Sequence, residues 1–265
     1  MNGTTLSILR ERSLFRRSCV AASIFLVVFT IGNQVLLQEG PALHWWTDSW
    51  WTLASLTAAL LCLDAARQPM MPNPRSWFFI GLGCFFWALG MVAWDIYELV
   101  FQWITPFPSL ADAGYSIASL LLLVGCLFPA HQRFSFFEQS KLVLDCMILI
   151  NVLAIGLTVF FYEAIVHAPM SVSGKVIALF YPIVPISASY ALWTSRSRME
   201  ADADRKSLSW VMAGMILLAT ANIGYLAPII TGGYQVGSRL DPLWTAAFLC
   251  IGLGAIHIRL KHTAG

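Results

Sequence analysis

Three carboxylates lie close together in the stretch WDIYELVFQWITPFPSLADAGY, residues 94–115, of a chain that is 58% hydrophobic and only 11% charged. Asp95 and Glu98 are spaced i and i+3, so that on a helix the two acids share one face. Asp112 follows after a loop that is rich in proline and aromatic residues. Paired acids of this kind can serve a hydrolase or a proton-coupled carrier. A polar loop between two membrane helices is the simpler interpretation of the same stretch.

The elements that position these acids are membrane-spanning helices. The mean hydropathy of +0.71 lies outside the range of soluble globular proteins. A membrane-spanning helix needs about 20 apolar residues, and by this criterion the sequence predicts an all-α, polytopic membrane helical bundle. The eight predicted spans are residues 19–37, 50–66, 77–101, 110–130, 142–162, 176–194, 208–228 and 240–257.

The sequence predicts one eight-helix transmembrane domain, residues 18–258, with a basic segment before it (1–17) and a short tail after it (259–265). Of the 16 lysines and arginines, only Lys175 and Arg239 fall between spans at the end of the bundle opposite to the termini. Positively charged loops stay in the cytoplasm, so both termini are expected there. The formal net charge of +2 does not predict a nucleic-acid partner.

The connections on the outer side of the membrane repeat a pattern. A polar residue ends the outgoing helix, and an Asp opens the returning helix with an aromatic residue three positions later. The three matching sets are Asn33, Asp48 and Trp51; Asp95, Asp112 and Tyr115; and Asn222, Asp241 and Trp244. The connection that begins at Tyr162 keeps the hairpin but lacks the acidic pair. This recurrence predicts a bundle built of repeated helical hairpins.

Two of the acids have a second explanation. Asp112 and Asp241 each lie three residues after a serine, Ser109 and Ser238. Ser-x-x-Asp is typical of a capping box, in which the acid lies near the positive end of the helix dipole. The two residues therefore fit a capping role as well as a role in a binding site.

Asp95 and Glu98 do not fit a capping role. They lie near the C-terminal end of their predicted helix, where the helix dipole disfavours negative charge. Ionisable side chains within a membrane-spanning segment usually face the bundle interior and pair with other polar groups. Arg239 is the expected cationic partner on the outer side. The candidate ligand-binding residues are Asp95, Tyr97, Glu98, Asp112, Tyr115, Asn222, Tyr225, Arg239, Asp241 and Trp244.

Metal and cofactor chemistry has little support in the sequence. His44 and His167 lie in predicted outer loops and could join Asp48 or Glu163 in a metal site, but no ligand spacing supports one. The six cysteines are scattered singly through apolar runs, without a CxxC pair. No HExxH, GxSxG or Walker-type motif occurs. We therefore expect no metal, no cofactor and no catalytic residue.

Three segments resemble a known family. WDIYELVFQWITPFPSLADAGY, VIALFYPIVPISASY and GGYQVGSRLDPLWTAAFLCIGLGAIH are similar to the multi-helix membrane input region that precedes GGDEF and EAL domains in bacterial cyclic di-GMP signalling proteins, and that also precedes histidine kinases. The resemblance covers about residues 77–257. Asp95 and Tyr97 approximate its Asp-x-x-Tyr element, with the tyrosine one position early. Its Pro-Ser-x-Ala-Asp-x-x-Tyr element is matched in full by Pro108, Ser109, Ala111, Asp112 and Tyr115.

The chain departs from the family pattern in two places. Asn222 and Tyr225 stand where the family tends to have Asp-x-x-Tyr. Tyr181 and Pro182 are not followed by the Gly-Asp that the family often carries. A site that needs all four acids is therefore not expected in this chain.

The resemblance implies a sensory input module of the bacterial inner membrane, acting as a homodimer within the lipid bilayer. Such a module detects a small ligand or a membrane condition at its outer face and passes the change to a cytoplasmic output, here cyclic di-GMP turnover. No GGDEF, EAL or kinase sequence follows the last predicted span, so the output domain is expected in cis beyond this sequence or in trans, and the chain itself is not expected to be an enzyme. The alternative is a small transporter or an intramembrane enzyme that uses Asp95 and Glu98.

Overall fold

The computed structural model describes residues 3–37, 40–69, 71, 73–103, 107–131, 134–199, 202–231 and 234–262. These residues contain no strand, and eight of their helices are long and apolar enough to cross a membrane. The predicted all-α bundle of eight spans is therefore confirmed. Arg133 and residues 263–265 of the predicted tail lie outside the described residues. The helices are α1 (Gly3–Ile31) with the π-helical turn η1 (Gly32–Leu36), α2 (Pro41–Ala66), α3 (Pro74–Asp95) with the π-helical turn η2 (Ile96–Val100), α4 (Leu110–His131), α5 (Phe136–Phe160), α6 (Tyr162–His167), α7 (Val172–Ser197), α8 (Asp202–Thr231) and α9 (Asp241–His262).

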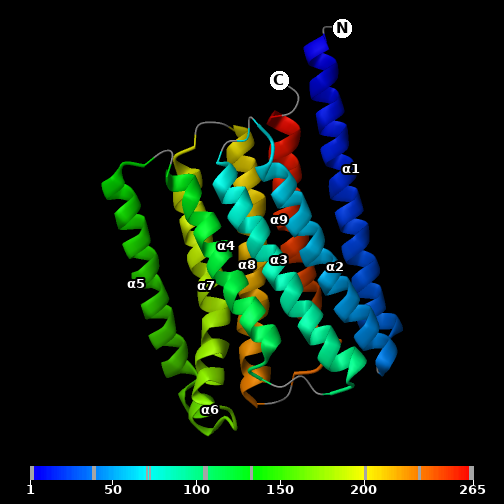
Figure 1. Ribbon diagram of the computed structural model, residues 1–265, viewed down its shortest axis with the longest axis vertical. Coiled ribbons are helices and arrows are strands. Elements are labelled where there is room, and N and C mark those ends of the chain that lie inside the picture. Colours follow the sequence, from blue (N-terminus) through cyan, green and yellow to red (C-terminus); the bar gives the residue numbers. More distant parts are fainter. Residues whose placement is uncertain are drawn as a thin grey trace.

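The chain begins and ends at the same end of the bundle (Figure 1). An even number of spans requires this arrangement, because each span reverses the direction of the chain. We call the opposite end, at which α1, α3 and α8 finish and α2, α4 and α9 begin, the distal end. The end that carries the start of α1 and the finish of α9 is the proximal end.

Six of the spans form a closed ring. Helix α2 packs against α3, α3 against α4, α4 against α7, α7 against α8, α8 against α9, and α9 against α2. Helices α1 and α5 lie outside this ring on opposite flanks of the bundle (Figure 1), α1 chiefly against α9 and α5 chiefly against α7. The ring therefore holds the buried core, and α1 and α5 are the two least buried spans.

The two halves of the chain follow a similar plan. In the half α1–α4 the first helix lies outside the ring, beside α9 and α2. In the half α5–α9 the first helix likewise lies outside, beside α7 and α4. Copies in the same orientation, related by an axis along the membrane normal, are one of the repeat types of membrane proteins. In both halves, the first helix is thus the one that lies outside the ring.

Small residues allow the ring helices to approach closely. A Cβ atom added at Gly114 of α4 would lie 2.8 Å from the Cα atom of Gly90 on α3. A Cβ atom added at Gly254 of α9 would lie 2.9 Å from the carbonyl oxygen of Ser207 on α8. Both positions exclude any side chain larger than hydrogen unless the helices move apart.

Helix boundaries differ from the predicted ones, most of all at α2. This helix begins at Pro41 rather than at residue 50, with a proline in its first turn, where the missing N–H of proline has no cost. The prediction began this span at residue 50. As a consequence His44, which was expected in a loop, and Asp48, which was expected at the very start of the returning helix, both lie within α2.

The other ends shift less. Helix α8 begins at Asp202, ahead of the predicted start of this span at residue 208. Helix α1 begins at Gly3, and the described part of the basic segment continues directly into the first span. Between α5 and α7 the chain forms an additional short helix, α6, which the sequence pattern did not indicate.

Candidate functional site

A cavity of about 70 Å³ lies inside the ring toward the distal end. Every ring helix contributes to its wall. The lining residues are Trp51 of α2; Trp87, Met91 and Trp94 of α3; Asp112 and Tyr115 of α4; Tyr181 of α7; Asn222 and Tyr225 of α8; Tyr234 of the α8–α9 connection; and Trp244 and Phe248 of α9. An occupant of this cavity would therefore touch all six ring helices.

The walls of the cavity are mainly aromatic. The rings of Trp87 and Tyr115 have centroids 4.8 Å apart, and those of Trp51 and Trp244 meet edge to face at 5.6 Å. Tyr225 also meets Trp244 edge to face, at 5.7 Å. Such aromatic pairs add to the stability given by burial alone, so that the cavity has a preformed shape.

A chain of hydrogen bonds runs through four of the ring helices. On α9, Trp244 donates from Nε1 to Oδ1 of Asn222 on α8 over 2.9 Å. Asn222 in turn donates from Nδ2 to the carbonyl oxygen of Tyr181 on α7, also over 2.9 Å. The hydroxyl of Tyr181 donates to Asp112 on α4. The relative positions of α4, α7, α8 and α9 are thereby fixed beside the cavity.

One donor in the cavity wall has no partner. The indole N–H of Trp94 is buried and forms no hydrogen bond among the described residues. A buried donor left without an acceptor costs about 1–3 kcal/mol. This donor belongs to a residue that lines the cavity.

Asp112 combines a capping role with a contact between helices. Its Oδ2 accepts from the backbone N–H of Ser109 over 2.6 Å and from the Ser109 hydroxyl over 2.9 Å. These bonds fit the predicted capping motif at the start of α4. Its Oδ1 accepts from Tyr181, so Asp112 also lies in the cavity wall.

The side chain of Asp241 is fully buried and accepts four hydrogen bonds. Oδ1 accepts from the Ser238 hydroxyl at 2.6 Å and from the Tyr234 hydroxyl at 3.0 Å. Oδ2 accepts from the backbone N–H of Gly237 at 2.8 Å and from Nδ2 of Asn33 at 3.2 Å. Asp241 therefore fixes the turn before α9 and joins it to η1, and it does not line the cavity.

Tyr234 is one of the four donors to Asp241. Burial, followed by the nearby Asp241, raises the pKa of Tyr234 well above its usual value. The hydroxyl consequently stays protonated and acts as a donor to Asp241 at any physiological pH.

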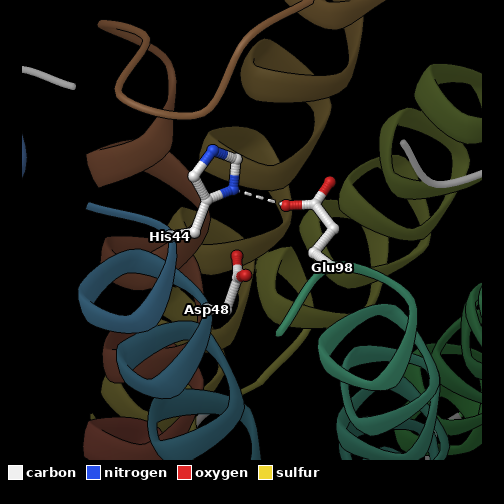
Figure 2. Close-up of side chains that lie close together, drawn as sticks. All are labelled: His44, Asp48 and Glu98. Atoms are coloured by element: carbon white, nitrogen blue, oxygen red, sulfur yellow. Dashed lines mark hydrogen bonds and ion pairs between the residues drawn. The ribbon is translucent and has the colours of Figure 1, made fainter. Parts of the chain in front are cut away.

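Asp95 and Glu98 face α2 and not the cavity. Oδ2 of Asp95 accepts from the hydroxyl of Thr52 over 3.0 Å. Oε2 of Glu98 is hydrogen-bonded to Nδ1 of His44 over 2.7 Å (Figure 2). The expected cation, Arg239, is exposed and forms no hydrogen bond or ion pair with the part of the chain that the structure describes.

The structure thus divides the ten candidate residues into groups. Asp112, Tyr115, Asn222, Tyr225 and Trp244 line the cavity. Asp95 and Glu98 lie on the α2 side, and Asp241 lies in its own turn. Tyr97 is half-buried but does not contribute to the cavity wall.

The sequence suggested that His44 could join Asp48 in a metal site, but it did not connect either residue with Glu98 or Thr52. His44, Asp48 and Thr52 are spaced i, i+4 and i+8 on α2, which places them in one stripe on the helix surface. This spacing is visible in the sequence, but it has meaning only if the helix starts before residue 44. The π-helical turns that finish α1 and α3, which hold Asn33 and Glu98, were also unexpected; such turns are frequent at functional sites.

No protein-family model matches the chain, and comparisons with curated proteins and with solved structures gave no significant match. The function must therefore be argued from the geometry of the site.

Proposed function

We propose that this chain is a membrane-embedded sensory input module that binds a small ligand in the distal cavity and passes the event to a cytoplasmic output. The observation that carries this proposal is a cavity to which all six ring helices contribute and one of whose lining residues, Trp94, has a buried N–H without a partner. The ligand would have an apolar body of a few non-hydrogen atoms, to suit about 70 Å³, and one hydrogen-bond acceptor.

Helix α9 is the direct route from the cavity to the proximal end. Trp244 and Phe248 lie in the cavity wall, and the same helix ends in a basic cluster. There Arg259 pairs with Asp64 of α2 at 2.7 Å, and Lys261 pairs with Glu11 of α1 at 3.1 Å. A ligand that favours one of two positions of α9 would change these contacts, which is the physical requirement for signalling across the bundle.

The membrane orientation is part of the proposal. Almost all lysines and arginines lie toward the proximal end, which supports cytoplasmic termini under the positive-inside rule. The resemblance to input regions of cyclic di-GMP signalling proteins supports a bacterial inner-membrane location, a homodimer, and an output domain that acts in cis or in trans.

A chimera tests the proposal. A diguanylate cyclase domain is joined after residue 265, and cyclase output is measured in cells for the parent and for Trp94→Phe, which removes the N–H but keeps a ring. The matched control is Trp45→Phe, since Trp45 is an exposed tryptophan near the distal end. We expect Trp94→Phe to change output at equal expression and Trp45→Phe to leave it unchanged. Equal output from all three chains under conditions in which the parent responds would contradict the proposal.

A second candidate function is an intramembrane enzyme or transporter that uses Asp95 and Glu98. The observation in its favour is the buried carboxylate of Asp48 beside the His44–Glu98 pair (Figure 2). On this account the purified chain, reconstituted in liposomes, would itself convert or move a substrate. Asp95→Asn and Glu98→Gln would abolish that turnover or flux. The sensory proposal expects no turnover and no flux from the chain alone.

A further inference from the structure

We infer that His44, Asp48 and Glu98 form a binding site for one divalent transition-metal ion of the Zn²⁺ class. One ligand atom from each residue can be chosen so that all three lie within 4.8 Å of one another. In a tetrahedral site with bonds of about 2.1 Å, ligand atoms lie about 3.4 Å apart. Nδ1 of His44 and Oε2 of Glu98 are 2.7 Å apart, which is closer than in such a site, and the three ligand atoms all lie within 4.8 Å of one another. Small side-chain movements therefore suffice for coordination.

Three residues of α2 face two acids of α3 and η2 across this site. His44 is hydrogen-bonded to Glu98, and two helical turns further along α2 Thr52 is hydrogen-bonded to Asp95. Asp48 lies on the same stripe of α2 midway between these two contacts. Figure 2 shows its carboxylate directed toward the His44–Glu98 pair. Packing of α2 against both α3 and η2 keeps these side chains together.

Asp48 provides the independent indication of a ligand. Its side chain is 0% exposed, and neither carboxylate oxygen has a hydrogen-bond partner in the structure. Buried carboxylates are ordinarily hydrogen-bonded, paired with a cation or bound to a metal, because an isolated buried charge is very costly. A metal ion between Asp48 and the His44–Glu98 pair would supply the missing partner.

The surrounding charge favours a cation of high charge. Asp95 adds a third carboxylate, and its Oδ1 is also buried without a partner. Within the described residues, no lysine or arginine forms an ion pair with Asp48 or Asp95. A divalent ion would offset much of this negative charge without bringing a long basic side chain into the bundle.

The ligand set identifies the class of metal. Mg²⁺ and Ca²⁺ prefer sites made only of oxygen atoms, whereas an imidazole nitrogen with carboxylates suits Zn²⁺ and its first-row neighbours. Three protein ligands leave a position for water. The side chain of His44 is 41% exposed and that of Glu98 is 11% exposed, so an ion can enter from the distal surface while Asp48 remains enclosed.

The inference does not depend on the proposed function, because metal binding is a property of the isolated chain. The full chain is purified in detergent, depleted of metal with a chelator, and titrated with ZnCl₂ by calorimetry. Bound zinc is counted by elemental analysis, and Co²⁺ is used as a spectroscopic probe of coordination. We expect one ion per chain, visible absorption bands typical of low-coordinate Co²⁺, and a rise in melting temperature with metal.

Two variants remove ligands and one pair of variants controls for surface binding. Loss of a residue that only supports a metal ligand weakens binding by up to about 100-fold. Asp48→Asn and His44→Gln remove ligands themselves, so each should weaken zinc binding by at least this factor. His167→Gln and Glu163→Gln remove the exposed His–Glu pair of α6, which has similar chemistry, and should leave the affinity unchanged.

Several outcomes would overturn the inference. These are the absence of stoichiometric zinc binding by the parent chain, binding that survives both ligand variants, and binding that is lost in the α6 controls. If Asp48→Asn does not fold, His44→Gln decides, since its partly exposed side chain can be replaced without burying a new group. Failure of these tests leaves the cavity and the Trp94 experiment unaffected.

Discussion

The hydroxyl of Tyr181 on α7 donates a hydrogen bond to Asp112, the acid that caps the first turn of α4. One carboxylate thus holds a helix end in place and ties that helix to its neighbour across the distal cavity. The bonds of Asp112 to Ser109 are those of the predicted capping box. The bond to Tyr181 depends instead on the packing of two helices that are distant in sequence.

Tyr181→Phe removes this interhelical bond and leaves one oxygen of a buried carboxylate without its donor. We expect the free energy of unfolding to fall by about 1–2 kcal/mol, measured by denaturant titration in detergent. Tyr190→Phe is the matched control on the same helix, because Tyr190 bonds to Asp145 over 3.2 Å at a partly exposed position. A loss of about 0.6 kcal/mol is expected there, and equal losses in the two variants would contradict the assignment.

Asp241→Asn replaces an acceptor of four hydrogen bonds by a group that carries donors of its own. Since the side chain is fully buried, we expect a loss of about 2–4 kcal/mol in the free energy of unfolding. Ser238→Ala removes only one of the donors and should cost about 1 kcal/mol, as for other helix caps. Thermal denaturation in detergent shows which of the two variants loses more stability. A smaller loss for Asp241→Asn than for Ser238→Ala would show that the turn does not need the charge.

Gly254→Ala tests the close contact between α8 and α9. The added methyl group would lie 2.9 Å from the Ser207 carbonyl oxygen, so the helices must separate, at an expected cost of about 1–3 kcal/mol. Gly156→Ala is the control, because a Cβ atom there meets nothing within 4 Å. The control should be neutral or up to about 1 kcal/mol more stable, given the higher helix propensity of alanine.

Cysteine labelling tests the proposed orientation. In a background without the six native cysteines, single cysteines replace two exposed residues, Thr231 at the distal end and Ser135 at the proximal end. A membrane-impermeant maleimide applied to intact cells should modify the cysteine at position 231 and should reach position 135 only after permeabilisation. The reverse pattern would place the termini outside the cell.

The sequence predicted the number of spans, the common end of the two termini and the capping motif of Asp112, because length, hydropathy and local spacing determine these features. It did not predict the full wall of the cavity. Trp94, Tyr181 and Phe248 resemble many other aromatic residues in apolar helices, and only the closure of the ring brings them together.

The His44–Asp48–Glu98 cluster was predicted only in part, since His44 was considered together with Asp48 but not with Glu98, and the reason is different. The prediction began this span at residue 50 rather than at Pro41, which left His44 in a loop and Asp48 at the very start of the returning helix. Since His44 was not expected to be helical, its i, i+4 spacing from Asp48 did not indicate a shared helix face. The contact partners of Asp241 were equally out of reach, because Asn33 lies 208 positions away in sequence.

That separation has a consequence for synthesis of the protein. Asn33 and Trp51 enter the membrane early, yet both donate hydrogen bonds to Asp241, which begins the final helix. At about 5–20 residues per second, translation needs roughly 10–40 seconds to reach it. During this interval the indole N–H of Trp51 lacks its acceptor, and the amide of Asn33 has the hydroxyl of Thr47 but not Asp241. Lipid headgroups, water or the insertion machinery must satisfy these groups, and the ring closes only after the ribosome has delivered its last member.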